Sequence, residues 1–503
     1  MRAADGGEGE RGGEQGGEGV APRLRRAAAQ MILSRWLALV IGVAALAVLS
    51  RLLTPQAFGL YAGLLALAAL AEVVCDFGVA ARLVRLDTLS RAERAAGEGL
   101  ALLLSGLVAG AALAAALLLG GRIGAEARGV LLLLAPCVLL VGVIAPSEAA
   151  LSRALRFGLI ARLGVLRMAV EAGTAIALAA AGLGPVALAG GLLAHRTVQA
   201  GLLLLARHRE GEPYAPSLRG AGAFLRFGRD YVVMESLPKG GDAAVKGAMA
   251  GLLGLAGLGL FDRAKQVVGL LDETLLKGIA PIVLPGLARA LQAGEAPRAV
   301  YRAKTDMLIA LLWPTFAVVA LLAEPLVLTL LGAQWTEAVP AVRTLAAAGL
   351  ALPIGKMSAN LFVALDAVPA YTRIRIVHQL VRVGLVALGA TQGLVWACAG
   401  GAASSFVRAG LVEAALHRRI GHRSTDLARP ARDGALLTLG ALAGPAALLW
   451  AWPEAPAAVL AVGGAAAAGL GWLAVAIGLR HRLATEALTL LAELRAARGA
   501  PAA

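Results

Sequence analysis

The sequence predicts an all-α polytopic membrane protein with about 14 transmembrane helices, and two observations lead to this fold class. First, 59% of the 503 residues are hydrophobic and the mean hydropathy is +0.76. This composition supplies many apolar stretches of about 20 residues, the length of a helix that crosses a bilayer. Second, Lys and Arg collect in every second connection between these stretches. Together the two properties exclude a soluble globular protein.

The alternation of basic residues also predicts how the helices are oriented. Six connections contain 23 Lys and Arg residues, whereas the intervening connections contain three, namely Arg51, Arg122 and Arg128. Because short cytoplasmic loops retain Lys and Arg, we expect the six basic connections and both termini to be cytoplasmic. The basic connections are 81–99, 149–163, 207–229, 288–304, 366–376 and 417–433.

In chain order, the first element is a Gly- and Glu-rich tail, 1–30, without an apolar run, which we expect to be disordered in the cytoplasm. The predicted membrane helices follow at 31–49, 57–80, 100–120, 129–148, 160–181, 186–206, 230–252, 260–287, 303–323, 338–363, 374–391, 394–416, 434–452 and 457–479. In the final segment, 480–503, Leu and Ala recur at helical spacing between charges, which predicts a cytoplasmic amphipathic helix.

Charge and cysteine content limit the classes of partner. The net charge of +15 would suggest a nucleic-acid partner for a soluble domain, but here Arg lies in short loops, where orientation and anionic lipid headgroups account for it. We therefore expect membrane lipid and no nucleic acid as a partner. Cys75, Cys137 and Cys398 lie singly within apolar stretches, so no metal site and no cofactor are predicted. A phosphate-binding G-x-x-x-x-G-K-[ST] loop is also missing from the sequence.

The seventh predicted helix carries four charges: Glu235, Lys239, Asp242 and Lys246. At about 100 degrees per residue they lie within an arc of roughly 60 degrees, so one face of the helix is ionic. Facing this stripe to lipid would cost on the order of 10 kcal/mol, which favours a water-filled cavity. The alternative is internal pairing, since Glu235 with Lys239 and Asp242 with Lys246 are both spaced i,i+4. Pro238 frees a backbone carbonyl in the middle of this helix, which also suits a cavity wall.

Further charges lie in other predicted helices. The eighth helix carries Asp262, Lys265, Glu273 and Lys277 on one side. Elsewhere the charges in or at the edges of the predicted helices are Arg35, Arg167, Lys356, Arg382 and Arg408, against Glu72, Asp76, Glu171 and Glu413. Such an excess of cations suits an anionic ligand, while a structural web of salt bridges is the alternative. Arg35 has the further alternative of extending to the membrane surface. We expect His195 and Arg196 to lie near the inner surface, without a role in proton transfer.

Two sequence elements resemble a known family. The turn Ser50–Tyr61 contains R-L-L-T-P-Q-A-F-G-L-Y, in which Thr54 can cap and Pro55 can begin the second helix. The second helix closes on Asp76-Phe77-Gly78, and Leu331–Trp335 adds a G-x-x-W element. This pattern is similar to that of the polysaccharide transporters, or O-antigen flippases, of the multidrug/oligosaccharidyl-lipid/polysaccharide (MOP) superfamily. The similarity in helix count and loop charge extends over about residues 31–480.

The resemblance implies two six-helix bundles, 31–206 and 230–416, joined by a cytoplasmic linker at 207–229 and followed by a basic loop and two further helices at 417–479. It also implies alternating access through a central cavity in the bacterial inner membrane. The expected activity is export of polyprenyl-pyrophosphate-linked oligosaccharide for surface polysaccharides such as O-antigen, lipopolysaccharide or exopolysaccharide. The expected pyrophosphate ligands are Lys239, Lys246, Lys265, Lys277, Lys356, Arg382 and Arg35. The acids expected to contribute to coupling with a proton or sodium gradient are Glu235, Asp242, Asp262, Glu273 and Asp76.

Three alternative functions remain open on the sequence. A lipid II flippase of the same superfamily fits the same pattern. A multidrug cation antiporter fits less well, because its cavity should favour acids and aromatic residues whereas this chain has 4% aromatics. A membrane glycosyltransferase or polymerase would need clustered acids in an outer loop, and the outer acids, such as Glu126 and Glu324, are isolated, so no catalytic residue is predicted. The glycan and the oligomeric state cannot be derived from the sequence.

Overall fold

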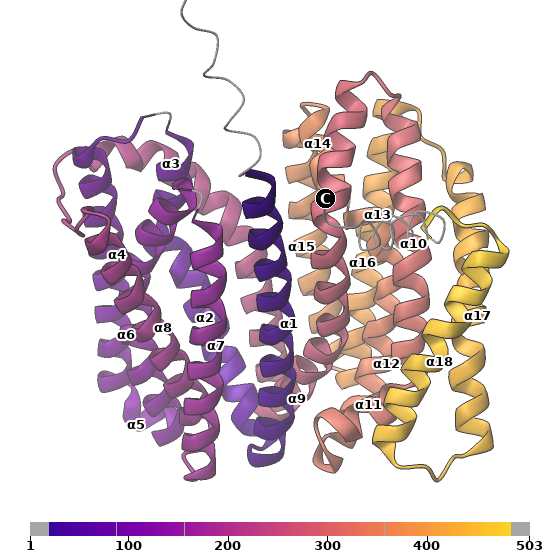
Figure 1. Cartoon of the computed structure of the whole chain (residues 1–503). Coiled ribbons are helices and arrows are strands. Elements are labelled where there is room, and N and C mark those ends of the chain that lie inside the picture. Colours follow the sequence, from indigo (N-terminus) through magenta and orange to yellow (C-terminus); the bar gives the residue numbers. More distant parts are fainter. Residues whose placement is uncertain (1–19, 87, 155, 357, 484–503) are drawn as a thin grey trace, which may run out of the picture. The chain divides into compact units, whose positions relative to one another are not determined.

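The structure, a computed structural model, describes residues 20–86, 88–154, 156–356 and 358–483 (Figure 1). Every regular element in these ranges is a helix. The helices of the first half are α1 (Val20–Leu52), α2 (Pro55–Asp76), α3 (Val79–Arg85), α4 (Arg91–Leu118), α5 (Gly120–Ile123), α6 (Ala125–Arg153), α7 (Phe157–Ala180), α8 (Val186–Arg209) and α9 (Gly222–Gln292). The expected tail at 1–30 lies mostly outside the described residues, as does the amphipathic helix expected at 480–503.

The helices of the second half begin with α10 (Pro297–Leu321) and α11 (Ala323–Leu330). The stretch predicted as one helix at 338–363 is divided into short α and 3-10 segments. The remaining elements are η1 (Ala333–Ala338), α12 (Val339–Ala347), η2 (Ala348–Ala351), α13 (Leu352–Lys356), α14 (Ser358–Ala364), α15 (Val368–Ala390), α16 (Leu394–Ile420), η3 (Ser424–Leu427), α17 (Ala428–Ala451) and α18 (Ala457–Gly478).

The chain forms two compact units. The first contains the described residues up to Leu46 together with Ala71–Val232, and the second contains Ala47–Leu70 and the described residues from Val233 onwards. In the first unit α4 packs along α6, α6 along α8 and α8 along α7; in the second, α15 packs along α16, and α17 along both α10 and α18. Each unit is a bundle of roughly parallel and antiparallel long helices (Figure 1).

The segment that follows α8 is fixed onto the first unit rather than being a loose linker. Glu98 of α4 and Arg207 of α8 form an ion pair of 2.5 Å in which each side chain is only 1% exposed. The second oxygen of Glu98 accepts the backbone N–H of Ala215 at 3.0 Å, and the Tyr214 hydroxyl donates to the carbonyl of Gly142 at 3.1 Å. Burial raises the pKa of that hydroxyl, so it stays protonated as a donor.

Eleven helical segments in the described part of the chain are long and apolar enough to cross a membrane. Three predicted helices do not appear among them separately: the first has a shorter apolar part, Trp36–Leu52; the eighth is continuous with the seventh; and α15 carries three arginines. The many apolar helices establish a multi-pass membrane protein, whereas the count of fourteen stays a prediction.

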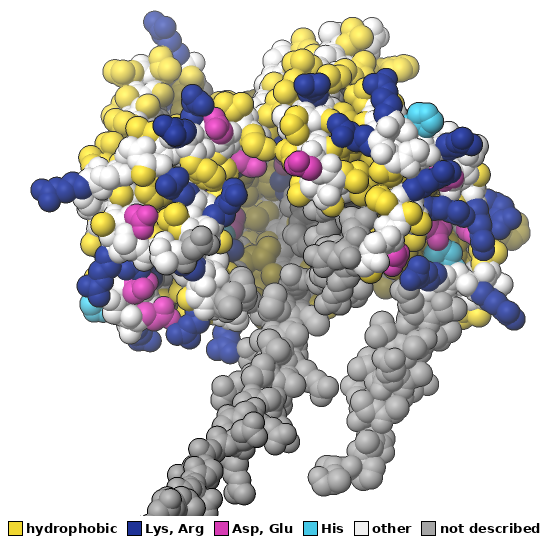
Figure 2. All heavy atoms as spheres, turned by 90° about the horizontal axis from the view of Figure 1, so that it is seen from above, with side chains coloured by type: hydrophobic (Ala, Val, Ile, Leu, Met, Phe, Trp, Pro, Cys, Tyr) yellow, Lys and Arg dark blue, Asp and Glu magenta, His cyan; other side chains and the backbone are white. Residues whose placement is uncertain are grey.

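Basic side chains are numerous at the end of the first unit that carries α3 and at the end of the second unit that carries α14 (Figure 2). The predicted basic connections 81–99 and 366–376 begin at α3 and just after α14, respectively. The distribution therefore agrees with the alternation of loop charge along the sequence.

Candidate functional site

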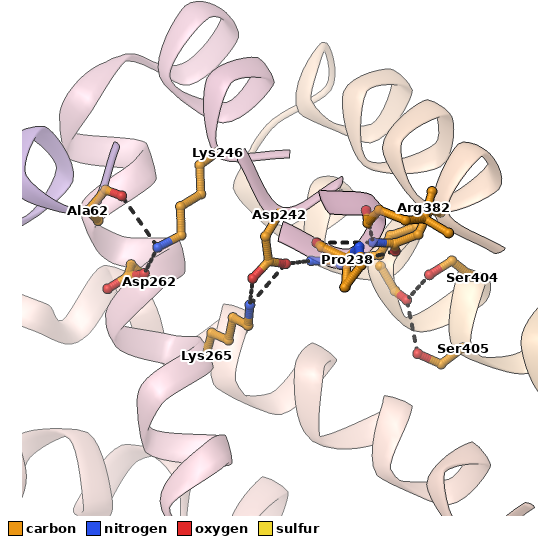
Figure 3. Close-up of polar contacts among 12 residues, drawn as sticks. Ala62, Pro238, Asp242, Lys246, Asp262, Lys265, Arg382, Ser404 and Ser405 are labelled. Carbon is orange, nitrogen blue, oxygen red and sulfur yellow. Dashed lines mark hydrogen bonds and ion pairs between the residues drawn. The ribbon is translucent and has the colours of Figure 1, made fainter. Parts of the chain in front are cut away.

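The seventh and eighth predicted helices form one element, α9, which reverses direction at Gly254. This residue has φ 74° and ψ 176°, a backbone conformation that glycine adopts readily. Lys246 Nζ lies 2.8 Å from Asp262 Oδ1, and Lys265 Nζ lies 3.3 Å from Asp242 Oδ2. Each pair joins residues at nearly equal distances before and after Gly254, so the two halves of α9 are antiparallel neighbours held by two ion pairs (Figure 3).

A third helix, α15, adds a cation and an amide to this site. The Arg382 guanidinium donates to Asp242, so this carboxylate lies between Lys265 and Arg382 (Figure 3). Gln379, one turn before Arg382, accepts from Arg382 Nη1 at 3.4 Å. The Gln379 amide donates to the carbonyls of Leu237 and Pro238, each at 3.2 Å. Hydrogen bonds thus join α15 to the first half of α9.

A glycine on α9 permits the close approach of Gln379. A Cβ atom at Gly241 would lie 2.3 Å from Gln379 Nε2, closer than atoms can pack, whereas one at Gly240 would meet nothing nearer than 3.9 Å. The two adjacent glycines therefore differ in role, and only Gly241 is required for the contact. The freed carbonyl that Pro238 was expected to leave is that of residue 234, but the two that Gln379 reaches are those of residues 237 and 238.

The other end of the cluster lies against α2. Lys246 also donates to the carbonyl of Ala62 at 3.5 Å (Figure 3). Asp262 accepts from its sequence neighbour Arg263 at 3.0 Å, and the Arg263 guanidinium lies 4.2 Å from the centre of the Phe58 ring. The side chains of Lys246, Asp262 and Arg263 are 14%, 16% and 12% exposed, so this end of the cluster is the more buried one.

The i,i+4 pairs considered for the seventh helix are not formed, since Asp242 and Lys246 each pair across the hairpin instead. Neither Glu235 nor Lys239 has an ion-pair or hydrogen-bond partner among the residues that the structure describes. Both side chains are partly exposed. Lys239 therefore differs from the other described cations of the hairpin, each of which faces a carboxylate.

The remaining predicted residues are placed as follows. Lys356 ends α13, and the guanidinium of Arg408 packs against its neighbour Gly355. Asp76 ends α2 in the first unit, where it accepts the N–H of Ala80 at 3.1 Å. The side chains of Arg35, Glu273 and Lys277 lie outside those described. Sequence reasoning missed Arg263, although it is a charge in an apolar stretch like the others, and Gln379, which as a neutral amide gives no such signal.

The two elements that carried the family resemblance meet in the second unit. Arg51 donates to the carbonyl of Thr329 at 2.8 Å, at the end of α11, and the Trp335 indole donates to the carbonyl of Ser50 at 2.8 Å. Trp335 is fully buried and packs edge-on against Phe58 at 5.5 Å between ring centres. The turn of the first element is thus a structural partner of the G-x-x-W element.

The fold is a helical bundle with many apolar helices, and solved structures of membrane transporters share it. Lipid II flippase MurJ in an inward closed conformation is similar with a TM-score of 0.71 and 10% identity, covering 90% of this chain and 98% of that one. An inward-facing MATE multidrug transporter of the MOP superfamily gives 0.53 at 17% identity, covering 78% and 94%. A MOP transporter from Pyrococcus furiosus gives 0.51 at 17% identity, covering 79% and 95%.

The family model for "Polysaccharide biosynthesis protein" matches residues 48–340, more than half of the chain. The chain belongs to this family of polysaccharide biosynthesis proteins. No curated protein matches the chain by sequence. The match begins just before the turn at Ser50 and ends just after Trp335, so it includes both elements of the resemblance.

Proposed function

We propose that the protein moves polyprenyl-pyrophosphate-linked oligosaccharide from the inner to the outer leaflet of the bacterial inner membrane, with both termini in the cytoplasm. The cations of the α9 hairpin and α15 hold the pyrophosphate, which is the part of the substrate that the bilayer core cannot dissolve. The isoprenoid tail stays in lipid, and the basic loops attract the anionic headgroup. Alternating access between the two helical bundles then exposes the glycan outside.

The observation that carries this proposal is the charge balance of the cluster. Between Glu235 and Lys265, together with Arg382, there are five cations and three carboxylates. The cations are Lys239, Lys246, Arg263, Lys265 and Arg382. The unbalanced positive charge of two would be costly in a low-dielectric membrane interior. A pyrophosphate diester, with one anionic oxygen on each phosphorus, would neutralise it.

The position of Asp242 supports a binding step in which a phosphate group replaces its carboxylate as the partner of two cations. Its carboxylate holds Lys265 and Arg382, and the side chains of Asp242 and Lys265 are 41% and 44% exposed. A phosphate oxygen can therefore approach these cations and take the place of the carboxylate. Lys239, which has no carboxylate partner in the described structure, is available to the ligand without such exchange. Lys246 and Arg263, which are less exposed and share Asp262, hold the hairpin together instead.

A lipid II flippase is the second candidate, and the similarity in fold to MurJ over most of both chains favours it specifically. Both candidates share the polyprenyl pyrophosphate and differ in the attached sugar. A cation antiporter is disfavoured by the surplus of positive charge at the site.

The proposal is tested by reconstituting the protein in liposomes that contain a fluorescent polyprenyl-pyrophosphate oligosaccharide or fluorescent lipid II. We expect transfer of the first lipid to the opposite leaflet, and a strong loss of transfer for Lys239→Gln. Glu337→Gln, a change at an exposed residue of η1 far along the chain from the hairpin, serves as the control. Transfer of lipid II alone would favour the second candidate, and transfer of neither lipid would contradict the flippase assignment for both.

A further inference from the structure

A second polar cluster lies within the first unit, on the long apolar helices α7 and α8. His195 Nδ1 lies 2.5 Å from Glu171 Oε2, and the two side chains are 18% and 37% exposed. Glu171 is 14 residues from the start of α7, about 21 Å along the helix, and His195 is nine residues from the start of α8. The pair therefore lies well inside both helices. This differs from the sequence-based expectation of a histidine near the inner surface.

One helical turn from this pair, a second group of polar side chains connects α7 and α8 to α6. Arg167 and Gln199 both donate to Glu148 Oε1, at 3.0 Å and 2.6 Å. Arg167 precedes Glu171 by four residues on α7, and Gln199 follows His195 by four on α8, so the two groups lie in successive turns. Glu148 is near the end of α6 that leads into the basic connection 149–163. The group around Glu148 therefore lies between the basic connection and the Glu171–His195 pair.

The charges of this cluster do not balance without a proton. Arg196, next to His195, donates to Glu72 of α2 at 2.9 Å. The cluster then contains three carboxylates, Glu72, Glu148 and Glu171, and two guanidinium groups, Arg167 and Arg196. With neutral His195 the sum is one negative charge, and with protonated His195 it is zero. Because an uncompensated charge is expensive in a low-dielectric interior, the cluster favours uptake of one proton.

Two other titratable groups lie near this cluster. One is the Cys137 thiol of α6, which is buried near Glu72, Glu171 and Arg196. Asp76 follows Glu72 by one turn at the end of α2, where its carboxylate accepts the N–H of Ala80. The charge balance given above counts the ion pairs of Glu72, Glu148 and Glu171 and does not include Asp76.

We propose that the Glu171–His195 pair is the proton-binding site through which the flippase is coupled to a proton gradient. One proton, shared between the imidazole and the carboxylate, neutralises the cluster; its loss leaves the cluster with one net negative charge. Such a change in charge biases helix packing between the two access states. The coupling role rests on the proposed flippase function, whereas proton binding by the pair does not.

Proton binding is tested by nitrogen NMR of the six histidine side chains in the purified protein in nanodiscs, with His195→Gln to assign the His195 signal. We expect Glu171→Gln to lower the midpoint of the His195 titration by about 1 to 3 pH units, because the neutral amide no longer stabilises the imidazolium. His208→Gln, at the exposed end of the same helix, should leave the His195 midpoint unchanged. The proposed proton-binding site is contradicted if the His195 midpoint is unchanged in Glu171→Gln. It is also contradicted if His195 stays neutral between pH 5 and pH 8.

Coupling is tested in liposomes that carry a pH gradient. We expect the gradient to accelerate glycolipid transfer by wild type and by His208→Gln, and to have no effect on His195→Gln and Glu171→Gln, which keep the rate seen without a gradient. If both variants respond to the gradient as wild type does, the pair is not the coupling site. If no variant transfers the lipid, the flippase assignment and the coupling role fail together, while the NMR titration still decides whether the pair binds a proton.

Discussion

The two units carry polar clusters of opposite charge balance on apolar helices. In the second unit, the cluster between Glu235 and Lys265 of α9, together with Arg382 of α15, contains five cations and three carboxylates. In the first unit, the cluster on α2, α6, α7 and α8 contains three carboxylates, two guanidinium groups and a histidine. One cluster therefore favours an anion, and the other favours a proton. On our two proposals, the substrate and the coupling proton therefore bind to different units.

The largest effect on stability is expected from a substitution of Asp262, in the cluster of the second unit. The Asp262→Asn variant leaves Lys246 and Arg263 without a carboxylate, although their side chains are only 14% and 12% exposed. Breaking a buried pair in this way typically costs about 3 to 5 kcal/mol, so we expect a marked fall in the unfolding temperature in detergent. Asp230→Asn, which removes a carboxylate that is 68% exposed, is the matched control. Equal stability of Asp262→Asn and wild type would show that the surplus of positive charge is already compensated elsewhere.

A smaller effect is expected from the contact between α9 and α15. Gly241→Ala places a Cβ atom 2.3 Å from the Gln379 amide, which must move and release the carbonyls of Leu237 and Pro238. Overpacking of this kind costs about 1 to 3 kcal/mol. Gly240→Ala, in the same helix with open space, should be neutral or stabilising by up to about 1 kcal/mol. Thermal unfolding of the two variants side by side measures the difference, and equal stability would contradict the role of Gly241.

In the first unit, removal of a carboxylate from the cluster should change the stability of the protein very little. Glu171→Gln removes one of three carboxylates and brings the cluster to neutrality while His195 is uncharged. At pH 9 we therefore expect the stability of this variant to equal or exceed that of wild type, within about 1 kcal/mol. Arg167→Gln, which enlarges the negative surplus around Glu148, should be clearly destabilised under the same conditions. A strong loss of stability in Glu171→Gln would mean that the carboxylate is already compensated by a cation.

The smallest effect concerns a pair outside the membrane-spanning segments. Hydrogen bonds from Arg298 and from the backbone N–H of Arg423 hold the pKa of Asp426 well below its usual range. A carboxylate with a lowered pKa in the folded state contributes stability above its unfolded pKa, about 3.9, and this contribution is lost as the pH falls through the folded pKa. Below about pH 5 wild type should lose stability more steeply than Asp426→Asn. Parallel curves of unfolding temperature against pH would contradict this.

The sequence predicted the general architecture because the bilayer determines both the length of the apolar stretches and the distribution of Lys and Arg between the loops. Helices lie in each of the predicted ranges, and the chain was expected to turn at 253–259, near the actual turn at Gly254. The turn is tighter than predicted because one glycine with positive φ reverses the chain, which composition alone does not reveal. The division of 338–363 into short segments was also not predicted, since its apolar pattern resembles that of a continuous helix.

The partners within the site were less predictable than its residues. Asp242 and Lys246 have i,i+4 spacing, which in an isolated helix predicts a pair. In the structure Asp242 pairs with Lys265 and Arg382 instead, and Lys246 pairs with Asp262. The contact between Asp242 and Arg382 joins residues 140 positions apart, and no local pattern reports it. Similarly, the His195 and Glu171 pair depends on the packing of α7 on α8, which the sequence spacing does not define.

The most direct test of the opposite charge balance is the affinity of purified protein in nanodiscs for sugar-free polyprenyl pyrophosphate. Lys239→Gln, Lys265→Gln and Arg382→Gln each remove a cation that the ligand can reach, and we expect each to weaken binding by roughly tenfold or more, since a hydrogen bond to a charged group contributes about 1.5 to 3 kcal/mol. Arg167→Gln and Arg196→Gln remove cations from the cluster of the first unit and should leave this affinity unchanged. Weakened binding only in the first-unit variants, or in none of the five, would contradict the assignment of the anion to the α9 hairpin.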